Sequence, residues 1–202
     1  MKMKSLLFTI FLLPLYIGCT SEPDPLEVPA SIQGLIVDSP ATKLPAFKLT
    51  DHNGDSFDVS RFKNKWSMVF FGFTNCPDVC PTSLTIMDKV SKKADLPDNM
   101  QYVFVSVDPK RDTPDKLKSF VEYFNEKFIG ATGPKAEIDK FQEPLGVVYG
   151  FEGDTNSEDY NVNHFAAIYI IDPKGRERAY ILPPHSEKQV SDAFELVYNY
   201  YK

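Results

Sequence analysis

The chain has 202 residues, of which 43% are apolar and 25% charged, and this ordinary globular composition excludes a disordered, collagenous or coiled-coil protein. Twenty-two basic and 28 acidic side chains give a net charge of −6, so no cationic surface is expected for phosphates and a nucleic-acid partner is excluded. The chain holds only three cysteines, Cys19, Cys76 and Cys80, and their positions carry most of the functional information.

The amino terminus predicts export and membrane attachment. Residues 1–18 combine two lysines with an apolar stretch before Cys19, which is the layout of a signal peptide and resembles a bacterial lipobox. An uncleaved anchor is the alternative, although the stretch is short for a membrane span. We expect a lipoprotein acylated at Cys19 and held to the membrane by that N-terminal lipid. The domain then lies on the extracytoplasmic (periplasmic) side of the bacterial cell envelope.

Residues 19–40 are predicted to form the acylated N-terminus and a flexible tether, because residues 21–29 hold three prolines and three acids with little to bury. Residues 41–202 are then predicted to form one domain. This length is sufficient for a single hydrophobic core.

The elements of this domain follow from its hydrophobic patterns. A hairpin with an Asn-Gly turn is expected over residues 47–59. Three stretches that are apolar on both faces predict central strands covered by helices, at residues 66–73, 101–107 and 165–171. Helices are expected between the first strand and Pro97, after an N-cap at Thr113, and over residues 137–145 and 187–200, with a hairpin turn at 173–176. This order predicts an α/β, thioredoxin-like fold: a central mixed β-sheet flanked by helices, with an N-terminal β-hairpin.

Cys76 and Cys80 form a CxxxC dithiol between a buried strand and a helix. The exposed N–H groups of a helix amino terminus favour a thiolate over a thiol. Residues four apart on a helix can form a disulfide or bind one metal ion together. A purely structural disulfide is the alternative, but so short a loop stabilises a fold little. We therefore expect a redox-active dithiol.

A soft metal bound by two thiolates needs a further ligand, and the chain holds three histidines. His52 in the hairpin turn and His185 after two prolines are expected to be exposed to solvent. His164 leads directly into a buried strand, where it can approach the dithiol; the alternative is a histidine that bonds a backbone carbonyl. Two thiolates and an imidazole suit Cu(I), and also Zn²⁺.

The segment 71–81 (FGFTNCPDVCP), together with 106–114 (SVDPKRDTP) and 159–164 (DYNVNH), resembles the Sco (SenC) family of copper-binding cytochrome c oxidase assembly proteins. The resemblance implies copper, as Cu(I) or Cu(II), bound by Cys76, Cys80 and His164. It also implies that Asp78 tunes the site without binding the metal. The family often has Asp before and Ser after the histidine, where this chain has Asn163 and Phe165, so altered hydrogen bonding of His164 is expected.

The expected function is that of a copper metallochaperone rather than an enzyme. The resemblance implies that it delivers copper to the copper site of cytochrome c oxidase subunit II, or to another exported copper protein, or prepares that acceptor's cysteines. A thiol reductant is an expected partner. The alternative is a thiol-disulfide oxidoreductase acting on exported dithiols, and this activity can also accompany copper delivery. A copper or redox sensor would leave no distinct mark in the sequence.

Asp108 and Asp112 stand four residues apart between a strand and a helix. Paired carboxylates can bind a hard metal ion, but Asp at such a junction routinely accepts backbone N–H bonds. We expect these two residues to cap and shape the loop.

Overall fold

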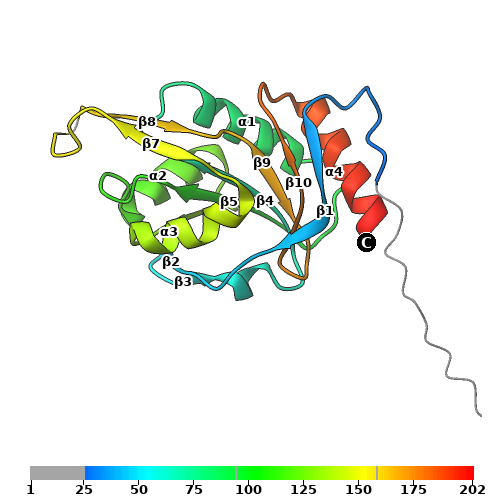
Figure 1. The fold of residues 1–202 in the computed structure, drawn as a ribbon, viewed down its shortest axis with the longest axis horizontal. Helices are drawn as coiled ribbons and strands as arrows, with labels where there is room; N and C mark the ends of the chain where they lie inside the picture. Colours follow the sequence, from blue (N-terminus) through cyan, green and yellow to red (C-terminus); the bar gives the residue numbers. More distant parts are fainter. Residues whose placement is uncertain (1–25, 94, 158) are drawn as a thin grey trace, which may run out of the picture.

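A mixed sheet of eight strands runs through the computed structural model, which describes residues 26–93, 95–157 and 159–202 (Figure 1). Its strand order is β1-β10-β9-β4-β5-β6-β2-β3. The predicted signal peptide, Cys19 and the first part of the tether lie outside the described residues. Within the described residues, no helix is both long and apolar enough to span a bilayer.

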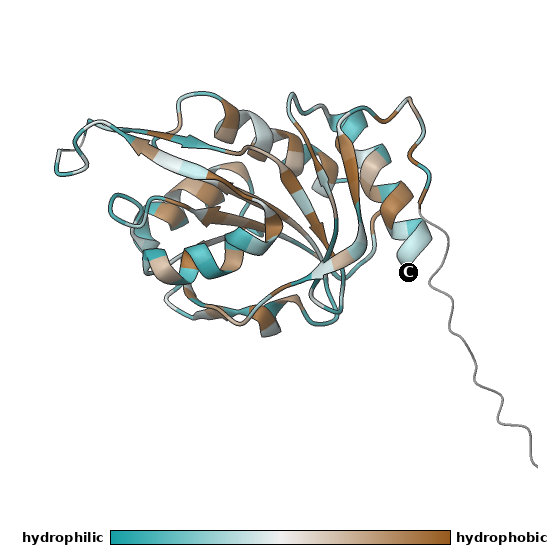
Figure 2. Cartoon of the chain, in the orientation of Figure 1, coloured by the Kyte–Doolittle hydropathy of each residue, from teal (hydrophilic) through white to brown (hydrophobic). Residues whose placement is uncertain are grey.

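The middle of the sheet confirms the predicted central strands. β4 (Trp66–Gly72) is buried along its whole length, lies parallel to β5 (Met100–Ser106) and antiparallel to β9 (Ile168–Ile171). Figure 2 shows hydrophobic residues along these central strands. β9 begins three residues later than predicted, because the Phe165 N–H bonds to the Val148 carbonyl (2.8 Å) and continues a different strand pairing.

Four α-helices cover the two faces of the sheet, and their ends match the capping signals of the sequence. The Thr113 hydroxyl accepts the Lys116 N–H at the start of α2, and Ser186 with Gln189 forms a capping box at the start of α4. The predicted helix over 137–145 is divided into α3 and a short 3-10 helix, η2. The helices are α1 (Val79–Ser91), α2 (Pro114–Phe124), α3 (Lys135–Gln142), η2 (Glu143–Leu145) and α4 (Glu187–Tyr201).

Side chains along β4 point alternately to the two faces of the sheet, and their contacts show which helices cover each face. Trp66 contacts Phe194 of α4, and Phe70 contacts Phe104, which in turn contacts Phe120 of α2. The neighbouring Phe71 points the other way and contacts Phe141 of α3. The ligand-bearing helix α1 packs against α4 and α2, so the predicted functional loop lies on the three-helix face.

At one edge of the sheet the predicted hairpin is confirmed, and at the other edge the predicted tether proves to be partly a strand. β2 (Lys48–Asp51) and β3 (Ser56–Asp58) form the predicted N-terminal hairpin, which joins the sheet through β6 (Ile129–Thr132). The 3-10 helix η1 (Val59–Phe62) follows it. At the opposite edge, β1 (Leu35–Lys43) pairs with β10 (Arg176–Ile181). The predicted extension of the tether to residue 40 is therefore wrong from Leu35 onward, because this residue pairs with Ile181 and is buried.

A separate two-stranded sheet projects from the main body, at the left of Figure 1. It consists of β7 (Tyr149–Glu152) and β8 (Asn161–His164), with Tyr149 directly opposite His164. The predicted ligand His164 is thus the last residue of a peripheral hairpin.

Candidate metal centre

The dithiol lies where β4 passes into α1. Cys76 is in the connecting loop and Cys80 in the first turn of the helix, and both thiols are free and buried. The backbone N–H of Cys80 points at Cys76 Sγ, at 3.4 Å. The strand–loop–helix context predicted from the sequence is confirmed, and it places helix N–H groups against a sulfur atom.

Gly72, the last residue of β4, makes room for the buried thiol. A Cβ atom at this position would lie 2.7 Å from Cys80 Sγ and 2.9 Å from the Phe104 ring, closer than van der Waals contact allows. Sequence reasoning missed this role, although a glycine inside an otherwise apolar strand signals the close approach of another group.

His164 completes the group. Its Nε2 lies 3.4 Å from Cys80 Sγ, and the three potential ligand atoms of Cys76, Cys80 and His164 all lie within 4.8 Å of one another. The rings of Phe70 and Phe73 pack nearly perpendicular to the imidazole, with centroids 6.0 and 5.8 Å away. The predicted approach of His164 to the dithiol is confirmed.

The other imidazole nitrogen, Nδ1, is buried and has no hydrogen-bond partner. Histidines that bind metals usually donate this second N–H to a carboxylate, carbonyl or water. The sequence carries Asn163 and Phe165 beside the histidine, and neither bonds Nδ1. Within the described residues, Nδ1 of His164 is therefore left without a partner, and the expected effect of Asn163 and Phe165 on its hydrogen bonding stays a prediction.

The two thiols differ in their electrostatics. A hydrogen bond from the Cys80 thiol, supported by His164 and by the backbone N–H groups of Asp78 and Cys80, lowers the pKa of Cys76 to about 4. Burial, reinforced by the neighbouring Cys76 sulfur, raises the pKa of Cys80 far above its usual range. At neutral pH the pair therefore consists of a Cys76 thiolate and a Cys80 thiol that donates to it.

The other two histidines are more buried than predicted. His52 is 7% exposed, because its Nδ1 accepts the Gly130 N–H at 2.9 Å. His185 is partly buried, with Nδ1 2.9 Å from the Ser83 hydroxyl and Nε2 3.0 Å from the Ile181 carbonyl. The expectation that both face solvent is wrong in each case, because a distant segment supplies a hydrogen-bond partner.

The acidic residues near the dithiol have different surroundings. Asp78 is exposed, and its carboxylate makes no capping bond to α1. Asp112 accepts the backbone N–H of Thr74 at 2.9 Å and its hydroxyl at 2.6 Å. Asp108 accepts from Tyr160 and Arg111, each at 2.5 Å. Asp112 accepts a backbone N–H and shapes the loop as predicted, but the predicted capping is wrong, because the N-cap of α2 is Thr113 and Asp108 accepts from side chains instead. The role of Thr74 was not foreseen.

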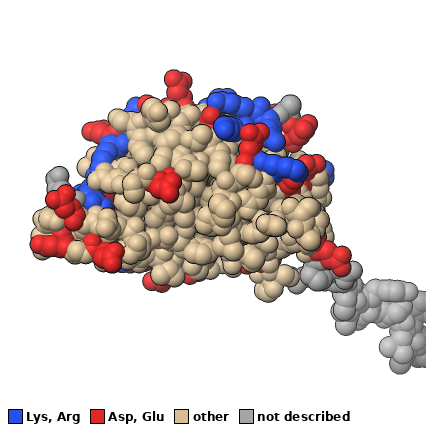
Figure 3. Space-filling model, turned by 90° about the horizontal axis from the view of Figure 1, so that it is seen from above, with Lys and Arg blue, Asp and Glu red and all other residues tan. Residues whose placement is uncertain are grey.

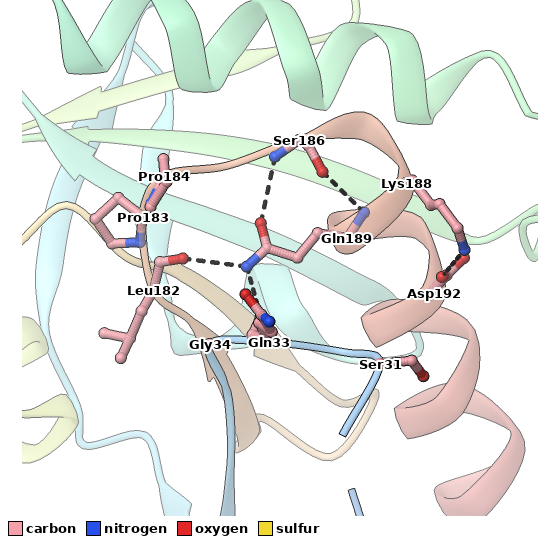
Figure 4. A pocket seen from close by; sticks show the side chains of 10 residues that line it. All are labelled: Ser31, Gln33, Gly34, Leu182, Pro183, Pro184, Ser186, Lys188, Gln189 and Asp192. Atoms are coloured by element: carbon pink, nitrogen blue, oxygen red, sulfur yellow. Dashed lines mark hydrogen bonds and ion pairs between the residues drawn. The ribbon is translucent and has the colours of Figure 1, made fainter. Parts of the chain in front are cut away.

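Two cavities flank the loop that follows β10. One, of about 410 Å³, opens beside the dithiol between the first turns of α1 and residues 183–185. The other, of about 460 Å³, lies between residues 31–34 and the start of α4 (Figure 4). There the Gln189 amide donates to the carbonyls of Gln33 (2.6 Å) and Leu182 (3.3 Å), and this fastens the chain before β1 to the loop.

The donor set of the centre is two sulfurs and one imidazole nitrogen, and within the described part of the chain it is the one group of three such residues close enough to hold a metal ion. Thiolates and imidazole bind soft or borderline ions and disfavour Mg²⁺ or Ca²⁺. The three converging donors can therefore hold one soft ion, and the two thiols can undergo dithiol–disulfide chemistry.

Comparison with known proteins gives consistent matches. The SCO1/SenC family profile matches residues 37–198. A SCO2-like protein from Rickettsia conorii is 37% identical over 153 residues, which cover 72% of each chain. The structure of Bradyrhizobium japonicum ScoI with copper bound superposes with a TM-score of 0.65 and 34% identity, over 76% of this chain and 99% of that one. A SCO1/SenC family lipoprotein from Bacillus anthracis gives a TM-score of 0.62 and 29% identity, over 76% of this chain and 94% of that one.

Proposed function

This chain belongs to the SCO1/SenC family, and we propose that it is a copper metallochaperone that binds copper through Cys76, Cys80 and His164. The observation that supports this most directly is the convergence of two thiols and one imidazole within 4.8 Å. The related ScoI structure contains copper, and a soft donor set of this kind suits Cu(I).

The residues of the centre have distinct roles in this proposal. The Cys76 thiolate is the first donor to the incoming ion, because it is charged at neutral pH. Cys80 loses its proton on binding, which makes the affinity depend on pH. His164 supplies an imidazole nitrogen from β8, and the exposed Asp78, two residues after Cys76, tunes the charge around the site.

Copper is the cargo, and its proposed acceptor is cytochrome c oxidase subunit II or another exported copper protein. Transfer proceeds by stepwise replacement of Cys76, Cys80 and His164 by the acceptor's cysteines. Figure 3 shows the side of the molecule on which α1 lies, and its middle is mostly uncharged, with basic and acidic residues mixed at the margins. Such a surface suits a protein partner better than a phosphate backbone.

A second candidate function, thiol-disulfide reduction, is favoured by the asymmetry of the two thiols. The Cys76 thiolate would attack an acceptor's disulfide, and Cys80 would then attack the mixed disulfide. The acceptor leaves as a dithiol, while Cys76 and Cys80 are oxidised to a disulfide by the same two electrons. An external thiol reductant restores the pair, so this reaction can precede metal delivery.

The proposed location is the outer side of a bacterial membrane, with a lipid on Cys19. This residue lies outside the described residues, and the support is the lipobox-like sequence together with the Bacillus lipoprotein relative. Detergent partitioning of the wild-type chain and a Cys19→Ser variant tests it. Equal partitioning of both into the aqueous phase would contradict lipid attachment.

Copper titration tests the main proposal. The reduced chain is titrated anaerobically with Cu(I), and separately with Cu(II), in the presence of a competing chelator. We expect one copper per chain and a strong loss of affinity in His164→Ala, with both thiols still titratable. His185→Ala is the matched control, because Ser83 and the Ile181 carbonyl already occupy both ring nitrogens of that imidazole. Unchanged stoichiometry and affinity in His164→Ala would refute the assignment.

A further inference from the structure

The segment 106–112 runs from the last residue of β5 to the start of α2, is buried at residues 106–108 and 112, and contributes no ligand to the centre. Its carboxylates Asp108 and Asp112 are each 1% exposed. Burial of two acids is costly unless their oxygens are hydrogen-bonded. The hydrogen-bond partners of these carboxylate oxygens therefore show which parts of the chain the segment holds in place.

Asp112 holds the loop that carries Cys76. Its carboxylate accepts both the N–H and the hydroxyl of Thr74, and also the hydroxyl of Ser106 at 2.7 Å. Thr74 stands two residues before Cys76, whose own N–H bonds to the Phe73 carbonyl in the same turn (3.2 Å). The position of the first thiol is thus fixed through Thr74.

Asp108, at the other end of the segment, holds the chain that carries His164. Its carboxylate accepts the Tyr160 hydroxyl at 2.5 Å and Arg111 Nε at 2.5 Å. Arg111 donates in turn to the Tyr160 carbonyl (2.9 Å) and lies over the Tyr160 ring, at 3.6 Å from its centre. Tyr160 directly precedes β8, whose last residue is His164.

The two ends are joined within the segment. The Asp112 N–H bonds to the Asp108 carbonyl at 3.0 Å. The Ser106 hydroxyl accepts the Asp108 N–H at 3.0 Å and donates to Asp112. Residues 106–112 therefore form one hydrogen-bonded unit, with the Cys76 loop at one end and β8 at the other.

We propose that this unit, the 106–112 bracket, positions His164 against the dithiol and thereby sets the spacing between the imidazole and the sulfurs. Asp108, Arg111, Asp112 and Tyr160 are positioning residues, because none of them belongs to the donor group of Cys76, Cys80 and His164. The inference rests on the proposed copper function for its consequence, whereas the coupling of the two ends is a property of the metal-free protein.

The test uses one variant at each end of the bracket. Tyr160→Phe removes the hydroxyl that bonds Asp108, and Asp112→Asn removes the charge that holds Thr74. Tyr102→Phe is the matched control, because it also deletes a buried hydroxyl, which here has no hydrogen-bond partner. Tyr102 lies near the start of β5, at the end of that strand away from the bracket.

Copper binding is the first readout. We expect both bracket variants to bind one Cu(I) per chain with an affinity lowered about tenfold, which is the scale of effects from residues that orient a metal ligand. The thiolate-to-Cu(II) charge-transfer band should also shift in both, and neither property should change in Tyr102→Phe. Wild-type affinity and band position in both bracket variants would overturn the proposal.

Amide hydrogen exchange of the metal-free protein is the second readout. The bracket predicts an effect at the far end: Asp112→Asn should speed exchange in residues 161–164, and Tyr160→Phe should speed it in residues 74–80. Changes confined to the mutated end would overturn the coupling. If the wild-type chain does not bind copper through its thiols, the copper function fails, and the exchange measurement still decides on the bracket.

Discussion

The thiols and the imidazole of the candidate centre belong to regions that are held in different ways. Cys76 and Cys80 follow a strand whose seven residues are all buried, and the adjacent Gly72 leaves no free space. His164 ends a two-stranded hairpin in which three of the four β7 residues are exposed. The core therefore fixes the sulfurs, whereas a few specific contacts fix the imidazole. Substitutions should act on stability in the first region and on local order in the second.

The largest expected effect is on thiol reactivity in the core region. Because the pKa of Cys76 is lowered to about 4, the thiolate predominates above this pH and reactivity is lost only as the pH falls through it. Alkylation of the reduced, metal-free chain by iodoacetamide, followed by mass spectrometry, should label Cys76 with a midpoint near pH 4. Cys80, with its raised pKa, should stay unlabelled at neutral pH.

His164→Ala tests one cause of this low pKa, because the imidazole contributes a hydrogen bond that lowers the Cys76 pKa. Its midpoint should lie above that of the wild type. A wild-type midpoint near the ordinary cysteine value of 9.0 would contradict the described geometry.

Gly72→Ala should have the next largest effect, on the free energy of unfolding. The new methyl group meets Cys80 Sγ and the Phe104 ring at less than 3 Å, and such overpacking costs about 3 kcal/mol. Urea denaturation measures the loss. Gly150→Ala in β7 is the matched control, since its Cβ would meet no atom within 4 Å. Equal free energies of unfolding for the two variants would contradict the view that the thiols are more tightly packed than the β7–β8 hairpin.

His185→Ala should show that His185 stabilises the fold and, unlike His164, does not bind the metal. The change leaves the Ser83 hydroxyl and the Ile181 carbonyl without their partner, at a cost of about 2 kcal/mol. Copper affinity should stay at the wild-type value. A large loss of affinity without loss of stability would assign His185 to the metal instead.

The same variant has a pH signature. Burial lowers the pKa of His185 below 6.5, so the unfolded chain takes up this proton first as the pH falls. The contribution of His185 to stability is complete above pH 6.5 and decreases as the pH falls through its folded-state pKa. The difference in stability between wild type and His185→Ala should therefore narrow in acid.

Tyr149→Phe should have the smallest effect on stability, and this effect should be confined to the hairpin of β7 and β8. It removes the 2.6 Å bond from the Tyr149 hydroxyl to Asp139, which fastens β7 to α3, at a cost of about 1 kcal/mol. Amide exchange should become faster in β7 and β8 while the midpoint of global unfolding moves little. Tyr123→Phe on α2 is the control, because that side chain is 83% exposed and its loss should change neither quantity.

The core elements could be predicted from the sequence, whereas the short and peripheral strands could not. The central strands, the capped helices and the CxxxC loop were predicted because each depends on local pattern. β6 was missed because it is only four residues long and contains Gly130 and Ala131. β7 and β8 were missed because Gly150, Asn161 and Asn163 have low strand propensity. β1 was missed because Pro40 interrupts an edge strand with a register shift.

For the centre, the sequence predicted the three candidate ligands but not their support. The burial of His52 depends on Gly130, 78 residues away, and that of His185 on Ser83, 102 residues away. The bonds from Thr74 to Asp112 span 38 residues. Partners at such separations follow from the tertiary fold and leave no periodic signal in the chain.

The register of β7 and β8 has a consequence for insertions and deletions. Tyr149 faces His164 and Glu152 faces Asn161, and side chains alternate between the two sides of a strand. A slip of one residue would turn Asn163 or Phe165 toward the thiols in place of His164. Length changes in the connecting turn between residues 153 and 159, before the bracket contact at Tyr160, are expected to leave this pairing intact. Deletion of Val162 or Asn163 within β8 would abolish the centre while every ligand remains in the sequence.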